Sequence, residues 1–304
     1  MTKVYILMGV YNGEAYLPAQ LDSIAAQDHV DWRLTCSDDG SSDESRTVIA
    51  DFARSVSQQV VIRNGPRKGF SENFLSMLRE LPDDTGHVAF ADQDDIWLPG
   101  KLARALERLP SDRPALYGAA TLVWTPATGV IRNTPPIRRP PCFANALVEN
   151  VATGNTMVLN PAAARFLRDA SQRIGAVYSH DWWTYALMTG AGHAVIYDDE
   201  PCMRYRQHAA NEIGAGETFL KRQRRNWSVG RGLYRRKVGQ NIDALSAVSD
   251  LLTPENLAML ATFADARDRS GPVARVVGLW RSGVFRQSRR DMVGFLGAGL
   301  SGLV

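Results

Sequence analysis

The first 110 residues alternate apolar runs of strand length with segments whose apolar residues repeat at helical spacing. The strand-like runs are residues 4–10, 32–37, 59–63 and 87–91. The helical spacing is clearest at Leu17, Leu21 and Ile24. Strands that alternate with helices form parallel β-α units, so the pattern predicts a layered α/β fold. Four such units in succession are typical of a nucleotide-binding sheet, mostly parallel and flanked by helices.

Local chemistry places two helix starts and one long loop. Ser71 is expected to cap a helix whose apolar face includes Phe74. Pro99 suits the first turn of a helix over residues 101–109. Five prolines between residues 126 and 141 predict a loop that is too long for a mere connector. This loop is either a lid over a site or surface padding.

Regular structure is expected to resume beyond this loop. The predicted elements are a segment at 155–159, a helix from Pro161, a segment at 180–189, and strands at 194–197 and 203–206. After residue 216 the composition turns Arg-rich and helical. We therefore expect two parts, an α/β catalytic domain of residues 1–215 and a basic, mainly helical region of residues 216–304.

The composition is that of an ordinary globular protein, with 45% hydrophobic and 22% charged residues. The net charge of +3 hides an asymmetry, because residues 216–304 contain fifteen Lys and Arg against seven Asp and Glu. Three widely spaced cysteines indicate neither a disulfide framework nor a thiolate zinc site, and they fit a reducing cytoplasm. No segment reaches the roughly 18 to 20 apolar residues of a membrane span, and the first apolar run lacks a signal-peptide cleavage site.

Three carboxylates, Asp92, Asp94 and Asp95, follow the strand-like run at 87–91. Divalent cations such as Mg²⁺ and Mn²⁺ take oxygen ligands and are often held by one or two carboxylates together with substrate phosphates. An Asp-x-Asp at a strand end therefore indicates a metal–diphosphate site, with a solvated acidic turn as the alternative. Asp95 is expected only to cap the turn before Pro99.

Polar residues also follow the other three strand-like runs, at 11–14, 37–43 and 64–69. Ligands of open α/β sheets bind at the carboxyl ends of the strands, so these residues are expected to converge in one crevice. Asp38 is explained equally well by a turn with a helix cap, whereas a further carboxylate at Asp39 is redundant there. Residues 66–70 supply cations and a glycine for a phosphate. A Walker motif and a Gly-x-Gly-x-x-Gly at the first turn are both absent.

The order of these motifs resembles the family 2 glycosyltransferases, which have the GT-A fold. The resemblance rests on residues 10–14, 21–27, 37–43, 68–74 and 92–97. Downstream, residues 153–157, 180–183 and 205–208 resemble the rhamnosyltransferase-like branch of that family. The motifs occur in the family's order over residues 3–214, which makes the set far more specific than any one of its members.

The resemblance implies a role for each matching position. The pyrimidine and ribose of a nucleotide-sugar would be held by Val10, Tyr11, Asn12, Glu14 and Asp39. Lys68 and Asn73 would lie near the diphosphate or the sugar. A divalent cation, Mn²⁺ or Mg²⁺, would be coordinated by Asp94 with Asp92 beside it, and His208 would be a further ligand. Imidazole suits Mn²⁺ better than Mg²⁺, so Mn²⁺ is favoured.

Asp181 is the candidate general base, because inverting transfer needs a carboxylate on the acceptor side. The alternative is an acidic residue that the dipole of the following helix favours. His180 stands where many family members carry Glu, and it is expected to pack or hydrogen-bond locally. Trp182 and Trp183 would form a platform for an acceptor sugar, with core packing as the alternative for one of the pair.

The basic C-terminal region combines cations with aromatic residues at 221–227 and 231–237. It suits an anionic membrane surface, then a solvated face or an oligomer contact, and least of all a nucleic acid. The apolar run at 292–304 is too short to span a bilayer but long enough to lie in its interface. We therefore expect a cytoplasmic protein, peripherally associated with the inner face of the cell membrane, with no nucleic-acid partner.

The resemblance thus implies a metal-dependent inverting glycosyltransferase of cell-surface polysaccharide synthesis. The expected donor is dTDP-L-rhamnose, and the expected acceptor is a saccharide or a lipid-linked saccharide. Another UDP- or dTDP-hexose is the alternative donor, and a non-catalytic saccharide-binding scaffold is the alternative function. The joint presence of Asp92, Asp94, Asp181 and His208 argues against the scaffold.

Overall fold

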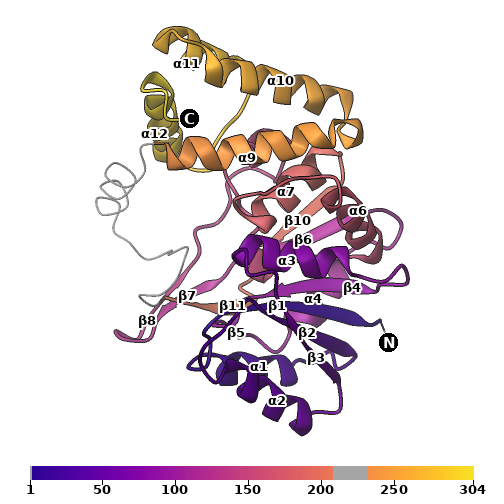
Figure 1. The fold of residues 1–304 in the computed structure, drawn as a ribbon. Coiled ribbons are helices and arrows are strands. Elements are labelled where there is room, and N and C mark those ends of the chain that lie inside the picture. Colours follow the sequence, from indigo (N-terminus) through magenta and orange to yellow (C-terminus); the bar gives the residue numbers. More distant parts are fainter. Residues whose placement is uncertain (1, 208–231) are drawn as a thin grey trace.

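The computed structural model describes residues 2–207 and 232–304, and its centre is a seven-stranded sheet (Figure 1). In spatial order the strands are β10 (Ala194–Asp198), β6 (Ala115–Ala119), β9 (Val158–Leu159), β4 (His87–Ala91), β1 (Val4–Val10), β2 (Trp32–Asp38) and β3 (Gln59–Asn64). Every pairing is parallel except the two that β9 makes with β4 and β6. The predicted mostly parallel sheet is confirmed, and β1 and β4 have the predicted bounds.

Helices cover both faces of this sheet, because the side chains of β1 alternate between two cores. Ile6 and Met8 pack with the helices of one face, and Leu7 packs with those of the other. The first face carries α1 (Leu17–Ala25), α2 (Ser45–Ser55) and α4 (Lys101–Arg108). The second face carries α3 (Phe70–Arg79), α5 (Phe143–Ala146), α6 (Pro161–Ser171) and α7 (His180–Gly190).

Helix α3 begins earlier than predicted. Its N-cap is Gly69, which has a φ of 87°, and the helix starts at Phe70. Ser71 therefore lies inside the first turn, and its prediction as the cap was wrong. A left-handed backbone favours glycine, so the backbone of Gly69 sets the turn where a side-chain cap was expected.

The proline-rich stretch is not a plain loop. Part of it forms a hairpin within a second, four-stranded sheet. In spatial order this sheet contains β5 (Ile96–Trp97), β11 (Met203–Arg206), β7 (Leu122–Thr125) and β8 (Val130–Asn133). Strand β11 has the predicted bounds and pairs with β5, which directly follows the acidic run. The small sheet therefore carries Arg206 to the acidic run.

The C-terminal helices lie beside α7 and share its core (Figure 1). They are α9 (Leu233–Ala247), α10 (Pro254–Asp268), α11 (Pro272–Arg281) and α12 (Arg289–Leu300). The Tyr234 hydroxyl donates to the Val148 carbonyl at 2.8 Å. The expected boundary near residue 215 falls in residues 208–231, outside the described residues, so the division into two domains stays a prediction. In the ranges that are described, no helix is both long and apolar enough to cross a bilayer.

Asn160 joins the end of β9 to the start of α6. Its amide oxygen accepts from the backbone nitrogens of Ala163 at 2.9 Å and Ala115 at 3.1 Å. Its amide nitrogen donates to the carbonyls of Pro110 and Arg113, both at 2.7 Å. The side chain is 1% exposed, so water cannot replace these four bonds. Asn160 therefore caps α6 and fixes the loop that leads into β6.

We expect Asn160→Ala to lower the free energy of unfolding by about 2–4 kcal/mol, because the cap is lost and buried backbone groups lose their partners. Urea unfolding of the two proteins measures this difference. Asp169→Asn, on an exposed part of the same helix, is the control and should change stability by less than about 0.5 kcal/mol. Equal effects of the two substitutions would contradict the assigned role.

Candidate active site

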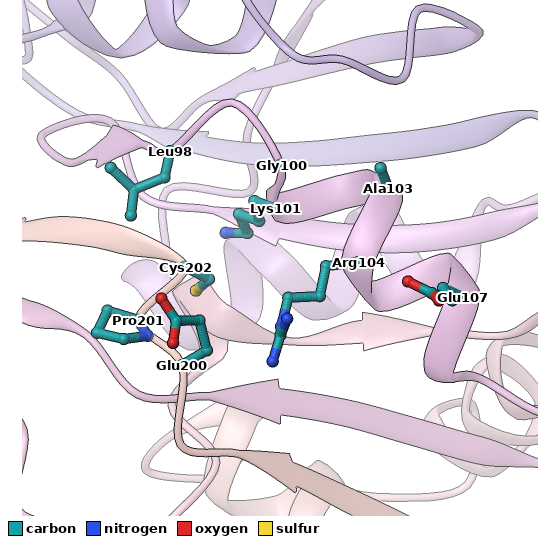
Figure 2. Close-up of a pocket in the computed structure, with 9 residues that line it drawn as sticks. All are labelled: Leu98, Gly100, Lys101, Ala103, Arg104, Glu107, Glu200, Pro201 and Cys202. Carbon is teal, nitrogen blue, oxygen red and sulfur yellow. The ribbon is translucent and has the colours of Figure 1, made fainter.

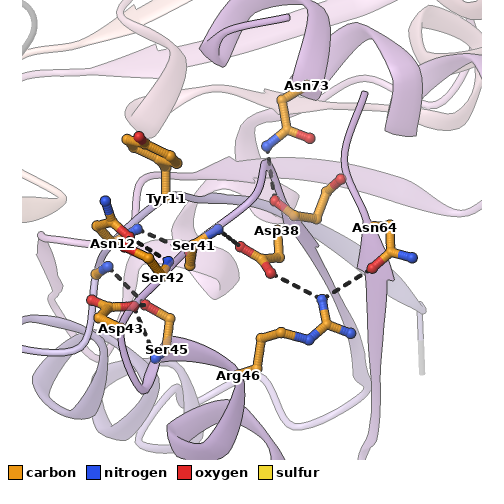
Figure 3. A network of polar contacts seen from close by, with 12 residues as sticks. Tyr11, Asn12, Asp38, Ser41, Ser42, Asp43, Ser45, Arg46, Asn64 and Asn73 are labelled. Atoms are coloured by element: carbon orange, nitrogen blue, oxygen red, sulfur yellow. Dashed lines mark hydrogen bonds and ion pairs between the residues drawn. The ribbon is translucent and has the colours of Figure 1, made fainter. Parts of the chain in front are cut away.

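Hydrogen bonds from short polar side chains join the ends of β1 and β2 (Figure 3). Asn12 has a left-handed φ of 46°, and its amide oxygen accepts from the backbone nitrogen of Ser42 at 2.8 Å. The backbone nitrogen of Asn12 donates to the Ser41 hydroxyl at 2.9 Å. The Glu14 carboxylate accepts from the backbone nitrogen of Glu44 at 3.2 Å. The predicted convergence of the first two strand ends is therefore observed, and Asn12 and Glu14 help to hold it.

Asp38 has a structural role at this edge. Its carboxylate accepts from the backbone nitrogen of Ser41 at 2.9 Å and pairs with Arg46 at 2.9 Å. Burial raises the pKa of Asp38, but the hydrogen bonds from Ser41 and the Arg46 charge outweigh burial and lower it. The interpretation of Asp38 as part of a turn is confirmed.

Asp39 holds the loop that follows β3. Its two carboxylate oxygens accept from the backbone nitrogens of Arg67 at 2.6 Å and Gly69 at 3.0 Å. Its own backbone nitrogen donates to the Val10 carbonyl at 2.8 Å. Lys68 lies between these two anchor points with an exposed side chain. Asp39 thus ties three strand ends together and presents Lys68 at the edge of the sheet.

Asn73 lies beneath this loop, in the first turns of α3. Its amide nitrogen donates to the Ser37 carbonyl at 2.8 Å, and its side chain is 2% exposed. A Cβ added at Gly65 would lie 2.8 Å from the amide oxygen of Asn73. Asn73 therefore packs under the loop and supports it, in addition to any contact with a donor.

Gln93 is a site residue to which the sequence assigned no role. Its amide oxygen accepts from the backbone nitrogen of Tyr11, and its amide nitrogen donates to the Tyr11 carbonyl, both at 2.9 Å. A Cβ at Gly13 would lie 2.3 Å from the Gln93 amide oxygen, so a side chain at this position would displace the Gln93 amide. This pair of bonds fixes the backbone of Tyr11 beside the acidic run and leaves its ring 58% exposed.

The three carboxylates of the acidic run lie close together. Oxygens of Asp92, Asp94 and Asp95 are within 4.8 Å of one another. Asp92 and Asp94 are half-buried, whereas Asp95 is fully buried. Burial and the neighbouring charges of Asp92 and Asp94 raise the pKa of Asp95 well above its ordinary value. A divalent cation would offset this crowding of negative charge, so the donor set fits a hard cation.

Asp95 does more than cap the turn before Pro99, and the expectation that it only does so was wrong. Its carboxylate accepts from the Asn155 amide at 2.8 Å and from the backbone nitrogen of Arg206 at 3.3 Å. The Lys101 ammonium donates to the Asn155 carbonyl and lies 3.6 Å from the centre of the Trp97 ring. Burial lowers the pKa of Lys101 to about 8. Asn155 therefore bridges a buried carboxylate and a buried ammonium directly beneath the acidic run.

Arg206, the last residue of β11, also bonds to the acidic run. Its side-chain Nε donates to the Asp94 carbonyl at 2.8 Å. Its guanidinium carbon lies 4.6 Å from the centre of the Trp124 ring and 5.4 Å from that of Tyr16. A guanidinium stacked on aromatic rings is well oriented, so Arg206 fixes the backbone of Asp94.

Asp181 lies in the first turn of α7. One carboxylate oxygen accepts from the backbone nitrogen of Gly154 at 2.9 Å. The other accepts from the backbone nitrogen of Trp182 at 2.7 Å and from the Ser179 hydroxyl. Gly154 precedes Asn155, so two adjacent residues connect Asp181 to Asp95. The carboxylate is half-buried and is held in one orientation by three donors.

The neighbours of Asp181 pack in the core. The His180 ring stacks on Phe74, with centroids 4.1 Å apart, and burial lowers its pKa to about 4. This confirms local packing of His180. Trp183 is fully buried, and Trp182 is 8% exposed with its indole nitrogen donating to the Ala146 carbonyl at 2.6 Å. Neither indole offers an open face, so the predicted platform for an acceptor sugar is not formed by these two rings.

His208, the predicted additional metal ligand, lies outside the described residues. A pocket of about 440 Å³ lies between α4 and the turn before β11 (Figure 2). None of the predicted site residues that the structure describes lines this pocket. We therefore place the candidate site at the carboxyl edge of the sheet and not in this pocket.

The bridge through Asn155 predicts coupling between Asp95 and Lys101. Asp95→Asn and Lys101→Met should each lower the free energy of unfolding by about 2–4 kcal/mol, because each leaves buried polar partners unsatisfied. The double variant should fall short of the sum by about 1–3 kcal/mol. Urea unfolding of the wild type, the two single variants and the double variant measures this shortfall from additivity. Lys68→Met, the same change at an exposed site, is the control, and strictly additive effects would contradict the network.

Comparison with known proteins agrees with this geometry. Residues 5–175 match the profile of the family described as "Glycosyl transferase family 2". The chain is 26% identical over 246 residues to the dTDP-rhamnosyl transferase RfbG of Shigella flexneri, which covers 79% of this chain and 84% of that protein. It is also 33% identical over 116 residues to the glucosyltransferase WfgD of Escherichia coli. That alignment covers 38% of this chain and 44% of WfgD.

Two solved structures share the fold. Residues 1–349 of Staphylococcus aureus TarS, in complex with UDP-GlcNAc, give a TM-score of 0.55 at 15% identity and cover 93% of both chains. The mannosyltransferase PcManGT from Pyrobaculum calidifontis, in complex with GDP-Man and Mn²⁺, gives 0.53 at 15% identity and covers 99% of this chain and 86% of that one. The family profile spans more than half of the chain, and the fold agrees with it. The chain is therefore a glycosyltransferase of family 2, with the GT-A fold and a resemblance to the rhamnosyltransferase-like branch.

Proposed function

We propose that this glycosyltransferase transfers L-rhamnose from dTDP-L-rhamnose, with inversion, to a saccharide or lipid-linked saccharide acceptor in cell-surface polysaccharide synthesis. One observation carries the proposal. Gly154 bonds Asp181, and the adjacent Asn155 bonds Asp95, the buried member of the acidic run, so a candidate cation site and a candidate base share one framework. The similarity to RfbG, named as a dTDP-rhamnosyl transferase, supports the choice of donor.

The ends of β1, β2 and β3 would bind the nucleoside. The exposed Tyr11 ring offers an apolar face to a pyrimidine, and Gln93 holds the backbone beneath it. Asp39 can accept a further hydrogen bond from the base or ribose, since a carboxylate has about four acceptor positions. Lys68 has the charge and exposure to contact the diphosphate.

Asp94 and Asp92 would hold a divalent cation, Mn²⁺ or Mg²⁺, with His208 as the proposed further ligand. The cluster of oxygens and their mutual repulsion fit such an ion. When bound, the cation would neutralise negative charge on the departing nucleoside diphosphate. Arg206, bonded to the Asp94 carbonyl, and Asn155, bonded to the Asp95 carboxylate, would keep the acidic run in place while the diphosphate leaves.

Asp181 would act on the acceptor. Its carboxylate would take the proton of the attacking hydroxyl as the acceptor oxygen bonds to the anomeric carbon. The bond from that carbon to the diphosphate oxygen breaks in the same step, so the nucleoside diphosphate leaves and the configuration inverts. The three donors on Asp181 fix the direction from which the carboxylate meets the hydroxyl.

The donor is tested by a thermal-shift screen of nucleotide-sugars with and without Mn²⁺. A ligand at 100 times its Kd stabilises the native state by about 2.7 kcal/mol, so the true donor should raise the melting temperature by several degrees. We expect dTDP-L-rhamnose with Mn²⁺ to give the largest shift. A larger shift with a UDP-hexose would assign that donor instead, and no shift with any nucleotide would favour a saccharide-binding scaffold.

The base is tested by Asp181→Asn. This change keeps the side-chain size but removes the proton acceptor, so the transfer rate should fall by about 10²- to 10⁴-fold. Nucleotide binding in the presence of metal should stay within about twofold, because the diphosphate site is separate. Asp112→Asn, an exposed carboxylate before β6, is the control. Full activity of Asp181→Asn, or loss of its nucleotide binding, would contradict the assignment.

A further inference from the structure

The last two helices carry an unusual amount of exposed apolar surface. Across the described residues, ten large hydrophobic side chains are exposed, and five of them lie on α11 and α12. They are Val273, Val277, Trp280, Val293 and Leu300. Single exposed apolar residues are normal, whereas a concentration of them marks an interaction surface. We call these five side chains the outer apolar face.

On α11 the exposed residues form one stripe. Val273, Val277 and Trp280 follow each other at spacings of four and three, so they lie on the same side of the helix. Trp280 is 73% exposed and Val273 is 71% exposed. The opposite side is already occupied, because a Cβ at Gly278 would lie 2.7 Å from the Cβ of Ala266 in α10. Helix α11 is therefore apolar on both sides, although the protein covers only one.

Helix α12 repeats this arrangement. Val293 and Leu300 are seven residues apart and lie on one side of the helix, with exposures of 71% and 49%. Phe295 points inward and packs on Tyr234 of α9, with ring centroids 6.4 Å apart. Arg289 and Arg290 precede Val293 by one turn and are exposed. The outer stripe of α12 is therefore apolar, with arginines at its start.

The charge around this face is predominantly positive. Residues 272–304 contain five arginines and a single aspartate, with no Lys or Glu. Arg275 is used inside the protein, where it donates to the Gly299 carbonyl at 2.8 Å. Arg286 lies 3.7 Å from Glu149. Arg281 and Arg289 are exposed beside the apolar stripes, so the outer apolar face has a positive rim.

We propose that the outer apolar face docks on the surface of an anionic lipid bilayer. Trp280 and the valines would enter the boundary between headgroups and acyl chains, where tryptophan is favoured. Arg281 and Arg289 would lie at the lipid phosphates. A second copy of the chain fits less well, because an isologous contact places the same arginine-rimmed patch on both sides and like charges repel.

This docking would place the active site close to the membrane. Helix α12 contacts Tyr234, whose ring lies 6.3 Å from that of Trp182, the residue after Asp181. A chain of three packed rings therefore joins the buried side of α12 to the helix that carries the candidate base. An acceptor anchored in the same bilayer would be presented to Asp181 without leaving it. The docking itself rests on α11 and α12 alone and does not depend on the proposed donor.

The test is flotation of the full chain with lipid vesicles. The wild type should float with vesicles that contain phosphatidylglycerol and much less with phosphatidylcholine alone, and salt should weaken the binding. Trp280→Ser with Val293→Ser should reduce partitioning by at least about tenfold, because apolar contact is lost. Arg281→Gln with Arg289→Gln should reduce partitioning onto the vesicles by about fivefold per arginine, because the attraction to the lipid phosphates is lost. Val30→Ser, at an exposed site in the loop before β2, is the control and should float as the wild type does.

Circular dichroism and the urea midpoint should show that all variants remain folded, since the changed side chains are exposed. Donor-induced thermal shifts should be unchanged in them, which separates failure of docking from failure of the proposed reaction. Flotation of the serine variant at the level of the wild type would overturn the proposal. So would a dimer that the serine variant loses in solution without lipid, because that result would assign the face to a second copy.

Discussion

The candidate site depends on one carboxylate that no water reaches. Asp95 is fully buried, and its partners come from the turn before β9 through Asn155, from β11 through Arg206, and from α4 through Lys101 by way of Asn155. Burying a charged or polar group is costly unless its partners are in place, so the native acidic run has one arrangement. Asp92 and Asp94 lie beside Asp95, half-buried, with their oxygens close together. Local repulsion between these groups is the feature that a bound cation would relieve.

Other polar side chains along this edge also hold the backbone by hydrogen bonds. Gln93 holds Tyr11, Asp39 holds the loop that carries Lys68, and Asn12 holds the turn after β2. Several residues that the family resemblance associates with the donor thus already hold backbone. This double use is reasonable, because a group that orients a donor must itself be oriented. The site is therefore built before any ligand arrives.

The fold was predictable where short-range patterns decide it. The apolar runs of strand length predicted β1 and β4 with their observed bounds, and the motifs at the strand ends indicated which residues converge. Strand β9 was less predictable, because two residues carry no periodicity and their pairing depends on strands far away in the chain. The burial of individual side chains was harder still to predict from the sequence. Asp95 reads as a turn residue, since its partners lie 60 and 111 residues away, and nothing local distinguishes buried Trp182 from a sugar platform.

If the acidic run holds a cation that in turn holds the diphosphate, dTDP binding must depend on the metal. Calorimetric titration of dTDP into the wild type and into Asp94→Ala, each with Mn²⁺ and with a chelator, measures this dependence. We expect the wild type to lose at least about 2 kcal/mol of binding free energy when the metal is removed, and Asp94→Ala to bind equally weakly in both conditions. Equal affinity of the wild type with and without metal would contradict this role of the acidic run.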